Sequence, residues 1–144
     1  MKIAIYPGVF DPLHKGHISI VEKSIKIFDR LIVLVSNNPE KVNSSNIDDR
    51  YKNVKQKLSL FKNVEVIKNE NKLTAHFANE NNINFIVRSA RNNYDINYEK
   101  ELAAANNKLN EGLETILIFP DYKNIGYESR MIKQGIKNDS DNNR

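Results

Sequence analysis

Residues 2–17 read Lys2-Ile-Ala-Ile-Tyr6-Pro-Gly8-Val-Phe10-Asp-Pro-Leu-His14-Lys-Gly16-His17, and this stretch decides the fold. Its first part, residues 3–6, is a short apolar run that predicts a buried strand. Two prolines and a glycine then break the strand into a turn, and helical spacing begins at Gly16. A strand, a tight loop and a helix start bring backbone N–H groups and the positive end of a helix dipole to one point. The stretch therefore predicts a phosphate-handling site.

Two histidines lie at the predicted helix start, His14 and His17, with Gly16 between them. Side chains three residues apart share one side of a helical turn, and each imidazole can donate a hydrogen bond to a phosphate oxygen. A His-x-x-His pair is also compatible with a metal site or with an ordinary polar helix start. Cysteine is absent, and His76 is the only other histidine. These facts, and the position after a strand and a Gly/Pro loop, favour phosphate binding.

The composition is that of one soluble globular domain. The chain has 144 residues, 40% hydrophobic and 28% charged, which is enough for one core and too few for two comfortable domains. No apolar run approaches the roughly 20 residues that cross a bilayer, and nothing at the N-terminus predicts export. The absence of cysteine fits a reducing compartment, so we expect a cytoplasmic protein without membrane contact. A net charge of +4 is modest and does not predict nucleic-acid binding.

Strand and helix patterns alternate along the rest of the chain. Residues 31–35 form a continuous apolar run, typical of a strand that is buried on both faces in a parallel sheet. Further strands are predicted at 64–67, 84–87 and 115–119, and helices at 18–28, 47–60, 73–81, 94–110 and 127–136. This alternation predicts an α/β fold, a single doubly wound, Rossmann-like domain over residues 1–136 with about five parallel strands. Residues 137–144 are expected to be a disordered polar tail.

Ligands of doubly wound sheets bind beyond the carboxyl ends of the strands, and charged side chains follow two of the predicted strands. Lys41 lies in the polar loop after the second strand, with Arg50 further on. Arg88 directly follows the fourth strand, and Arg91 comes three residues later. Lysines in polar loops are usually solvated, and the arginines are also compatible with an ordinary surface pair. Their position at the predicted crevice, and the bidentate geometry of guanidinium groups, favour phosphate contacts.

The segment Gly8-Val-Phe-Asp-Pro-Leu-His14-Lys-Gly-His17 resembles the GxFDPxHxGH signature of the nucleotidyltransferase superfamily. Within it, the chain is most similar to the phosphopantetheine adenylyltransferase family, from Lys2 to about Ile136. The resemblance implies the transfer of the adenylyl group of ATP to 4′-phosphopantetheine, which gives dephospho-coenzyme A and pyrophosphate in coenzyme A biosynthesis. It implies Mg²⁺ as the cofactor, with no metal-ligating residue in the chain, and a homo-oligomer, since the family is typically hexameric.

The resemblance also assigns roles to residues. His17 would stabilise the transition state, and His14 would contact the nucleotide phosphates. The residues that match the family's ATP site are Val9, Phe10, His14, His17, Ser89, Ala90, Arg91, Glu99, Asn124, Ile125, Gly126, Tyr127, Glu128, Ser129 and Arg130. Those that match its phosphopantetheine site are Val9, Lys41, Thr74 and Arg88. Of these, Lys41 and Arg88 would hold the acceptor phosphate.

The chain departs from the family pattern at several of these positions. Val9 replaces a Thr or Ser, Ser89 a Gly and Ala90 a Leu, and residues 127–130 replace an Ile-Ser-Ser-Ser/Thr motif. A left-handed backbone at position 89 would make Ser89 costly, and Glu128 would place a carboxylate near phosphates. Two alternatives stay open. One is another adenylyl- or cytidylyltransferase, such as nicotinate-mononucleotide adenylyltransferase, and the other is a nucleotide-binding module with weakened catalysis.

Overall fold

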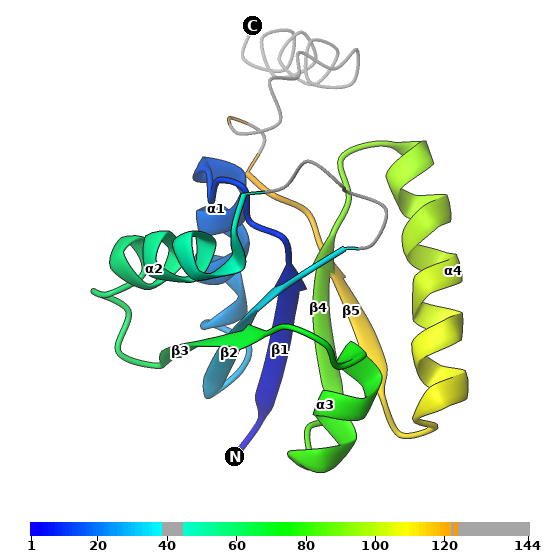
Figure 1. Cartoon of the computed structure of the whole chain (residues 1–144). Helices are drawn as coiled ribbons and strands as arrows, with labels where there is room; N and C mark the ends of the chain where they lie inside the picture. Colours follow the sequence, from blue (N-terminus) through cyan, green and yellow to red (C-terminus); the bar gives the residue numbers. More distant parts are fainter. Residues whose placement is uncertain (39–44, 122, 124–144) are drawn as a thin grey trace, which may run out of the picture.

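The computed structural model describes residues 1–38, 45–121 and 123 of the chain (Figure 1). Its elements follow one another as β1 (Ile3–Gly8), α1 (Lys15–Ser24), β2 (Arg30–Ser36), α2 (Ile47–Lys57), β3 (Val64–Asn69), α3 (Thr74–Glu80), β4 (Phe85–Ser89), α4 (Asn93–Leu109) and β5 (Glu114–Ile118). The strands and helices predicted within these ranges are present, with ends that differ by a few residues. The helix predicted at 127–136 and the tail at 137–144 lie outside the described residues. None of the described helices combines the length and the apolar character needed to span a membrane.

The five strands form one parallel sheet in the order β3-β2-β1-β4-β5, which confirms the predicted fold class. β1 is the central strand, and its residue Ile5 lies opposite Ile32 of β2 on one side and Ile86 of β4 on the other. The chain builds outward from β1 to β3 and then crosses back to β4. The order therefore reverses between β1 and β4, which in a doubly wound sheet is where the ligand crevice opens.

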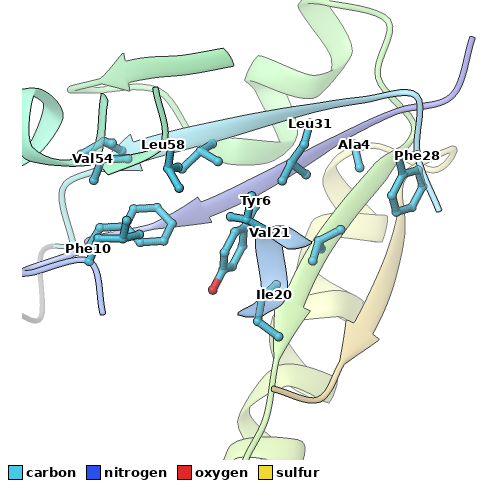
Figure 2. Packing of buried hydrophobic residues seen from close by; sticks show 13 residues of the cluster. Ala4, Tyr6, Phe10, Ile20, Val21, Phe28, Leu31, Val54 and Leu58 are labelled. Atoms are coloured by element: carbon cyan, nitrogen blue, oxygen red, sulfur yellow. The ribbon is translucent and has the colours of Figure 1, made fainter. Parts of the chain in front are cut away.

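Alternate residues of β1 are buried on opposite faces of the sheet. Ala4 and Tyr6 belong to a core cluster that includes Val21 of α1 and Val54 of α2 (Figure 2). Ile5 belongs to a second cluster, with the alanines of α3. Helices α1 and α2 therefore cover one face and α3 the other, with α4 next to α3 (Figure 1). Burial on both faces is the physical reason why β1 and β2 contain continuous apolar runs.

Helix α1 ends at Ser24, before the predicted end at residue 28. The Ser24 hydroxyl donates to the carbonyl of Ile20 at 2.7 Å, and the chain continues from there as a turn. Phe28 still lies in the core, with only 5% of its surface exposed. The apolar spacing therefore continues beyond the helix itself, and this is why the sequence pattern places the end of the helix too far along the chain.

Candidate active site

A cleft of about 970 Å³ opens at the carboxyl ends of the strands. Its walls are the β1–α1 loop, the ends of β2 and β4, the start of α3, one side of α4 and Pro120 after β5. The predicted site residues that line it are Val9, Phe10, His14, His17, Thr74, Arg88, Ser89, Arg91 and Glu99. Ala90 is buried, with 1% of its surface exposed. Lys41 and the residues predicted at 124–130 lie outside the described residues.

His14 and His17 cap the first turn of α1 reciprocally. His14 is the N-cap residue, and its Nδ1 accepts hydrogen bonds from the backbone N–H groups of Gly16 at 3.1 Å and His17 at 3.4 Å. The Nδ1 of His17 accepts in return from the backbone N–H of His14 at 3.1 Å. The two rings stack with centroids 3.7 Å apart. This is the arrangement of a capping box, built here from two imidazoles.

The capping determines which nitrogen carries the proton in each neutral ring. Nδ1 accepts a hydrogen bond in both His14 and His17, so it has no proton and the Nε2 atoms are the N–H donors. Both rings line the cleft at the N-terminus of α1. In its neutral form each ring therefore has its N–H donor at Nε2, beside the positive end of the helix dipole, where an anion is stabilised.

Gly16 provides the space that the His14 ring occupies. A Cβ at position 16 would lie 2.9 Å from Cε1 and 3.1 Å from Nδ1 of His14. The glycine is needed because any side chain would displace the imidazole from the capping position. The motif thus requires glycine at this position for contact with its own histidine.

We predict that Gly16→Ala lowers kcat by about tenfold or more, because the displaced His14 ring loses its alignment. The free energy of unfolding should change little. Alanine favours the helix over glycine by about 1 kcal/mol, and this gain offsets the weakened cap. Steady-state kinetics and thermal unfolding of the variant measure both quantities. A variant with unchanged kcat would show that the ring position is irrelevant to turnover.

The pKa of His14 depends on its surroundings. Burial lowers it from the ordinary value of 6.5, and the charges of Arg91 and Lys57 lower it further. Between the folded-state pKa and 6.5 the unfolded chain therefore binds a proton at this position that the folded chain does not. This difference in proton binding contributes to the free energy of unfolding. The contribution is fully present above pH 6.5 and is lost as the pH falls below that value.

We expect the free energy of unfolding to decrease on acidification from about pH 7.5 to about pH 5.5 more steeply in the wild type than in His14→Asn, because asparagine caps a helix but does not titrate. Denaturant unfolding at a series of pH values measures the two slopes. Identical slopes would show that His14 makes no contribution to the pH dependence.

Phe10 supports the histidine pair from within the core. Its ring, 4% exposed, meets His17 edge-on at a centroid distance of 5.0 Å and Tyr6 at 5.2 Å. Phe10 has a φ of 52°, a left-handed conformation that costs about 1–3 kcal/mol in a non-glycine residue. Gly8 makes room for this ring, because a Cβ there would lie 2.8 Å from Cζ of Phe10.

Burial raises the pKa of Tyr6 to about 12, so its phenol stays neutral beside the cleft.

Arg88 and Glu99 form the buried ion pair of the cleft. The Nε and Nη2 of Arg88 donate to the two oxygens of Glu99 at 2.8 and 2.7 Å, and Nη1 donates to the carbonyl of Pro7 at 2.9 Å. Burial opposes the positive charge, but the hydrogen bonds and charge of Glu99 outweigh this effect, so the pKa of Arg88 lies above its ordinary value. Three of the five guanidinium N–H groups donate to these described residues.

Arg91 and Ser89 lie on either side of buried Ala90. The side chain of Arg91 is 62% exposed, and its Nε lies 3.5 Å from a carboxylate oxygen of Asp95. The Arg91 guanidinium is therefore solvated at the rim, whereas that of Arg88 is held by three hydrogen bonds. Among the described residues other than glycine, only Phe10 and Asn82 have a positive φ. Ser89 is not in the left-handed region, so its substitution for glycine carries no backbone strain.

Arg50 is a buried residue whose role the sequence does not indicate. It is 3% exposed, and its guanidinium donates to the carbonyls of Val9, Ser36 and Ser45 at 2.8, 2.8 and 2.9 Å and to Oδ1 of Asn37 at 2.6 Å. It thus joins the β1–α1 loop to the end of β2 and the start of α2. No local pattern indicates this burial, because the acceptors come from three separate segments.

An apolar side of the cleft was also not predicted from the sequence. Leu73 precedes α3, and Tyr98, Leu102 and Leu109 lie along one side of α4, beside Thr74. Leu73, Tyr98 and Leu109 are 55%, 44% and 51% exposed. The helical spacing on α4 indicates an apolar face, but only the fold shows that this face borders the cleft and not the core.

The amino-acid sequence is similar to those of known enzymes over most of its length. The family model described as Cytidylyltransferase-like matches residues 5–135. A phosphopantetheine adenylyltransferase of Mycoplasma capricolum subsp. capricolum is 40% identical over 134 residues, which are 93% of this chain and 96% of that relative. A phosphopantetheine adenylyltransferase of Wigglesworthia glossinidia brevipalpis is 39% identical over 92% of this chain and 79% of its own length.

Solved structures share the fold. The lipopolysaccharide core biosynthesis protein of Thermoplasma volcanium matches with a TM-score of 0.59 at 25% identity, over 84% of this chain and 97% of that chain. A bifunctional NMN adenylyltransferase/ADP ribose pyrophosphatase of Francisella tularensis matches with a TM-score of 0.60 at 15% identity, over 90% of this chain and 39% of that chain. Taken with the sequence matches and the capped histidine pair, these similarities identify the chain as a member of the phosphopantetheine adenylyltransferase family of nucleotidyltransferases.

Proposed function

We propose that this enzyme transfers the adenylyl group of ATP to 4′-phosphopantetheine, which yields dephospho-coenzyme A and pyrophosphate in coenzyme A biosynthesis. The arrangement of the cleft supports this reaction in addition to the family membership. The capped histidine pair at the N-terminus of α1 and the fixed guanidinium of Arg88 line the same cleft. A site for two anionic substrates needs two groups of donors of this kind. The identity of the relatives favours this reaction over the other nucleotidyl transfers.

The proposed chemistry is a direct in-line displacement. A phosphate oxygen of 4′-phosphopantetheine attacks the α-phosphorus of ATP, the new P–O bond forms, and the bond to pyrophosphate breaks. The nucleophile is already an anion, so the step needs no general base and no covalent enzyme intermediate. The protein contributes by holding two polyanions in line and by stabilising the charge that develops on the transferred phosphoryl group.

The two histidines carry the transition-state stabilisation in this proposal. His17 donates from Nε2 to an oxygen of the α-phosphoryl group, and His14 donates to the nucleotide phosphates. Because both rings are held by backbone hydrogen bonds, little reorganisation is needed as charge develops. The helix dipole of α1 acts on the same phosphates.

The acceptor is proposed to lie on the other side of the cleft. Arg88 and Lys41 hold its phosphate, and Thr74 contacts the pantetheine part. The apolar side chains of Leu73 and Leu102 border the path from Arg88 along α4, which suits the carbon skeleton of that arm. The preformed pairing of Arg88 with Glu99 supports this assignment, since it holds the guanidinium in place before substrate arrives.

ATP is proposed to occupy the remaining side of the cleft, with Arg91 as a phosphate contact at the rim. The residues at 89–91 and 124–130, together with Glu99, are also proposed to belong to the ATP site. The structure adds that the Glu99 carboxylate is paired with Arg88. Its effect on the nucleotide is therefore proposed to pass through the ion pair.

Mg²⁺ is proposed as the counter-ion of the ATP phosphates. Within residues 1–38, 45–121 and 123, no three His, Cys, Asp or Glu side chains gather into a set that could hold a metal ion. Magnesium in nucleotide sites is commonly bound by substrate phosphates and water with few protein ligands. This chemistry supports delivery of the ion with ATP, and no step of the mechanism above depends on a protein-bound metal.

The cellular setting is proposed from family resemblance and composition. We infer a homo-oligomer that works in the cytoplasm. Sedimentation of the purified protein measures the assembly directly.

The reaction is tested by incubating the purified protein with ATP, Mg²⁺ and one acceptor at a time, and by measuring pyrophosphate. Release with 4′-phosphopantetheine, but not with nicotinate mononucleotide, is the expected result. Release only with nicotinate mononucleotide would assign another adenylyltransferase activity. ATP binding without turnover of any acceptor would assign a nucleotide-binding module.

A further inference from the structure

Lys57, the last residue of α2, reaches the β1–α1 loop without lining the cleft. Its Nζ donates to the carbonyl of Leu13 at 2.8 Å. Arg50 lies seven residues earlier, two turns along the same helix, and donates to the carbonyl of Val9 in the same loop. Two cations on one side of α2 therefore hold two carbonyls of the loop that carries the histidine motif.

The carbonyl held by Lys57 belongs to the peptide group whose N–H contacts His17. In a trans peptide the C=O of one residue and the N–H of the next point in opposite directions from one rigid plane. The Leu13 carbonyl accepts from Lys57, and the His14 N–H of the same peptide donates to Nδ1 of His17 at 3.1 Å. A single rigid group thus connects the ammonium of Lys57 to the imidazole of His17.

We propose that Lys57 is a positioning residue for the adenylyl transfer, acting on His17 through the Leu13–His14 peptide. By fixing this peptide it keeps the His14 N–H directed at Nδ1 of His17, and so keeps the His17 proton on Nε2. The positive charge also polarises the peptide and strengthens its N–H as a donor. The inference rests on the proposed function, because the Nε2–H of His17 is the group assigned to the transferred phosphoryl.

Lys55 offers a matched control on the same helix. It carries the same charge two residues away, but its Nζ donates to the hydroxyl of Tyr51 at 3.4 Å and lies 5.6 Å from the centre of that ring. Among the described residues it makes no hydrogen bond to the loop. Loss of either lysine changes the net charge equally. Only the loss of Lys57 removes the donor to Leu13.

The kinetic test compares Lys57→Met, Lys57→Arg and Lys55→Met. We expect Lys57→Met to lower kcat about tenfold, as for a displaced donor, with the KM values of both substrates changed by less than about twofold. Lys57→Arg, which keeps a charged donor, should recover most of kcat, and Lys55→Met should match the wild type. Wild-type kcat in Lys57→Met, or an equal loss in Lys55→Met, would overturn the proposal.

The spectroscopic test does not depend on activity. The chain has three histidines, and His76 on α3 is an internal reference. Long-range ¹H–¹⁵N spectra distinguish the Nε2–H tautomer from the Nδ1–H tautomer. We expect the Nε2–H pattern for His17 in the wild type and Lys57→Arg, and a mixture in Lys57→Met, with His76 unchanged. An unchanged His17 pattern in Lys57→Met would overturn the positioning role of Lys57, whatever the activity of the enzyme. A wild-type protein without turnover would overturn only the proposed adenylyl transfer.

Discussion

His17→Ala is expected to lower kcat by about 10²–10³, the effect of removing one preorganised donor to a transition state, while ATP still binds. The loss should be this large because the Nε2–H of His17 is held in place before the reaction by the backbone of its own helix turn. His14 and Arg91 are also proposed to contact the nucleotide phosphates, so the affinity for ATP should change by less than about tenfold. Pyrophosphate release measures kcat, and equilibrium titration with ATP measures affinity.

The control for this experiment is His76→Ala. His76 is an exposed histidine on α3 and does not line the cleft, so its variant should keep the wild-type rate. Near-normal turnover in His17→Ala would remove His17 from the mechanism. A parallel loss of ATP affinity and kcat would instead assign it to ground-state binding of the nucleotide.

Arg88→Met is expected to affect both stability and acceptor binding. Glu99 is only 6% exposed, and loss of its partner leaves a buried carboxylate unpaired, which typically costs about 3–5 kcal/mol. The KM for 4′-phosphopantetheine should rise about 10²-fold, because charge-assisted hydrogen bonds to its phosphate are lost. Denaturant unfolding and steady-state kinetics with each substrate varied in turn measure these effects.

The double variant Arg88→Met with Glu99→Met separates the two effects. Replacing both members of a buried ion pair with apolar side chains is often neutral for stability, so the double variant should regain most of the lost free energy of unfolding. Its KM for 4′-phosphopantetheine should stay high, because the phosphate-binding guanidinium is still missing. A double variant that regains a normal KM would show that Arg88 serves only to neutralise Glu99.

Arg91→Met provides the matched comparison within the same segment. The Arg91 side chain is 62% exposed, so its removal should change stability by less than about 0.5 kcal/mol. If Arg91 contacts ATP at the rim, the KM for ATP should rise and that for 4′-phosphopantetheine should not. The opposite pattern in the two single variants would exchange the proposed roles of the arginines.

The fold could be predicted from the sequence because its determinants are local. The apolar run at 31–35 indicates a strand buried on both faces, and the observed β2 spans Arg30–Ser36. Runs of this kind that alternate with amphipathic stretches leave few arrangements other than a parallel sheet between helices. The turn after α1 shows the limit of the method, since apolar spacing continues through Phe28 although the helix ends at Ser24.

The residues 2–17 determined the centre of the candidate site by themselves. The partners of the histidine pair are only three residues apart, and the glycine that admits the His14 ring lies between them. Contacts over such short distances follow from the helical turn alone. The sequence was therefore sufficient to predict a strand, a loop and two imidazoles beside an anion-binding helix start.

Only the tertiary structure decided what surrounds and supports that centre. Arg88 and its acceptor Pro7 are 81 residues apart, Lys57 and Leu13 are 44 apart, and Arg50 and Val9 are 41 apart. An arginine or lysine looks solvated in a sequence, because the carbonyls and carboxylates that bury it belong to segments that meet only when the sheet has formed. The sheet order, with β1 between β2 and β4, brings those segments to the histidines.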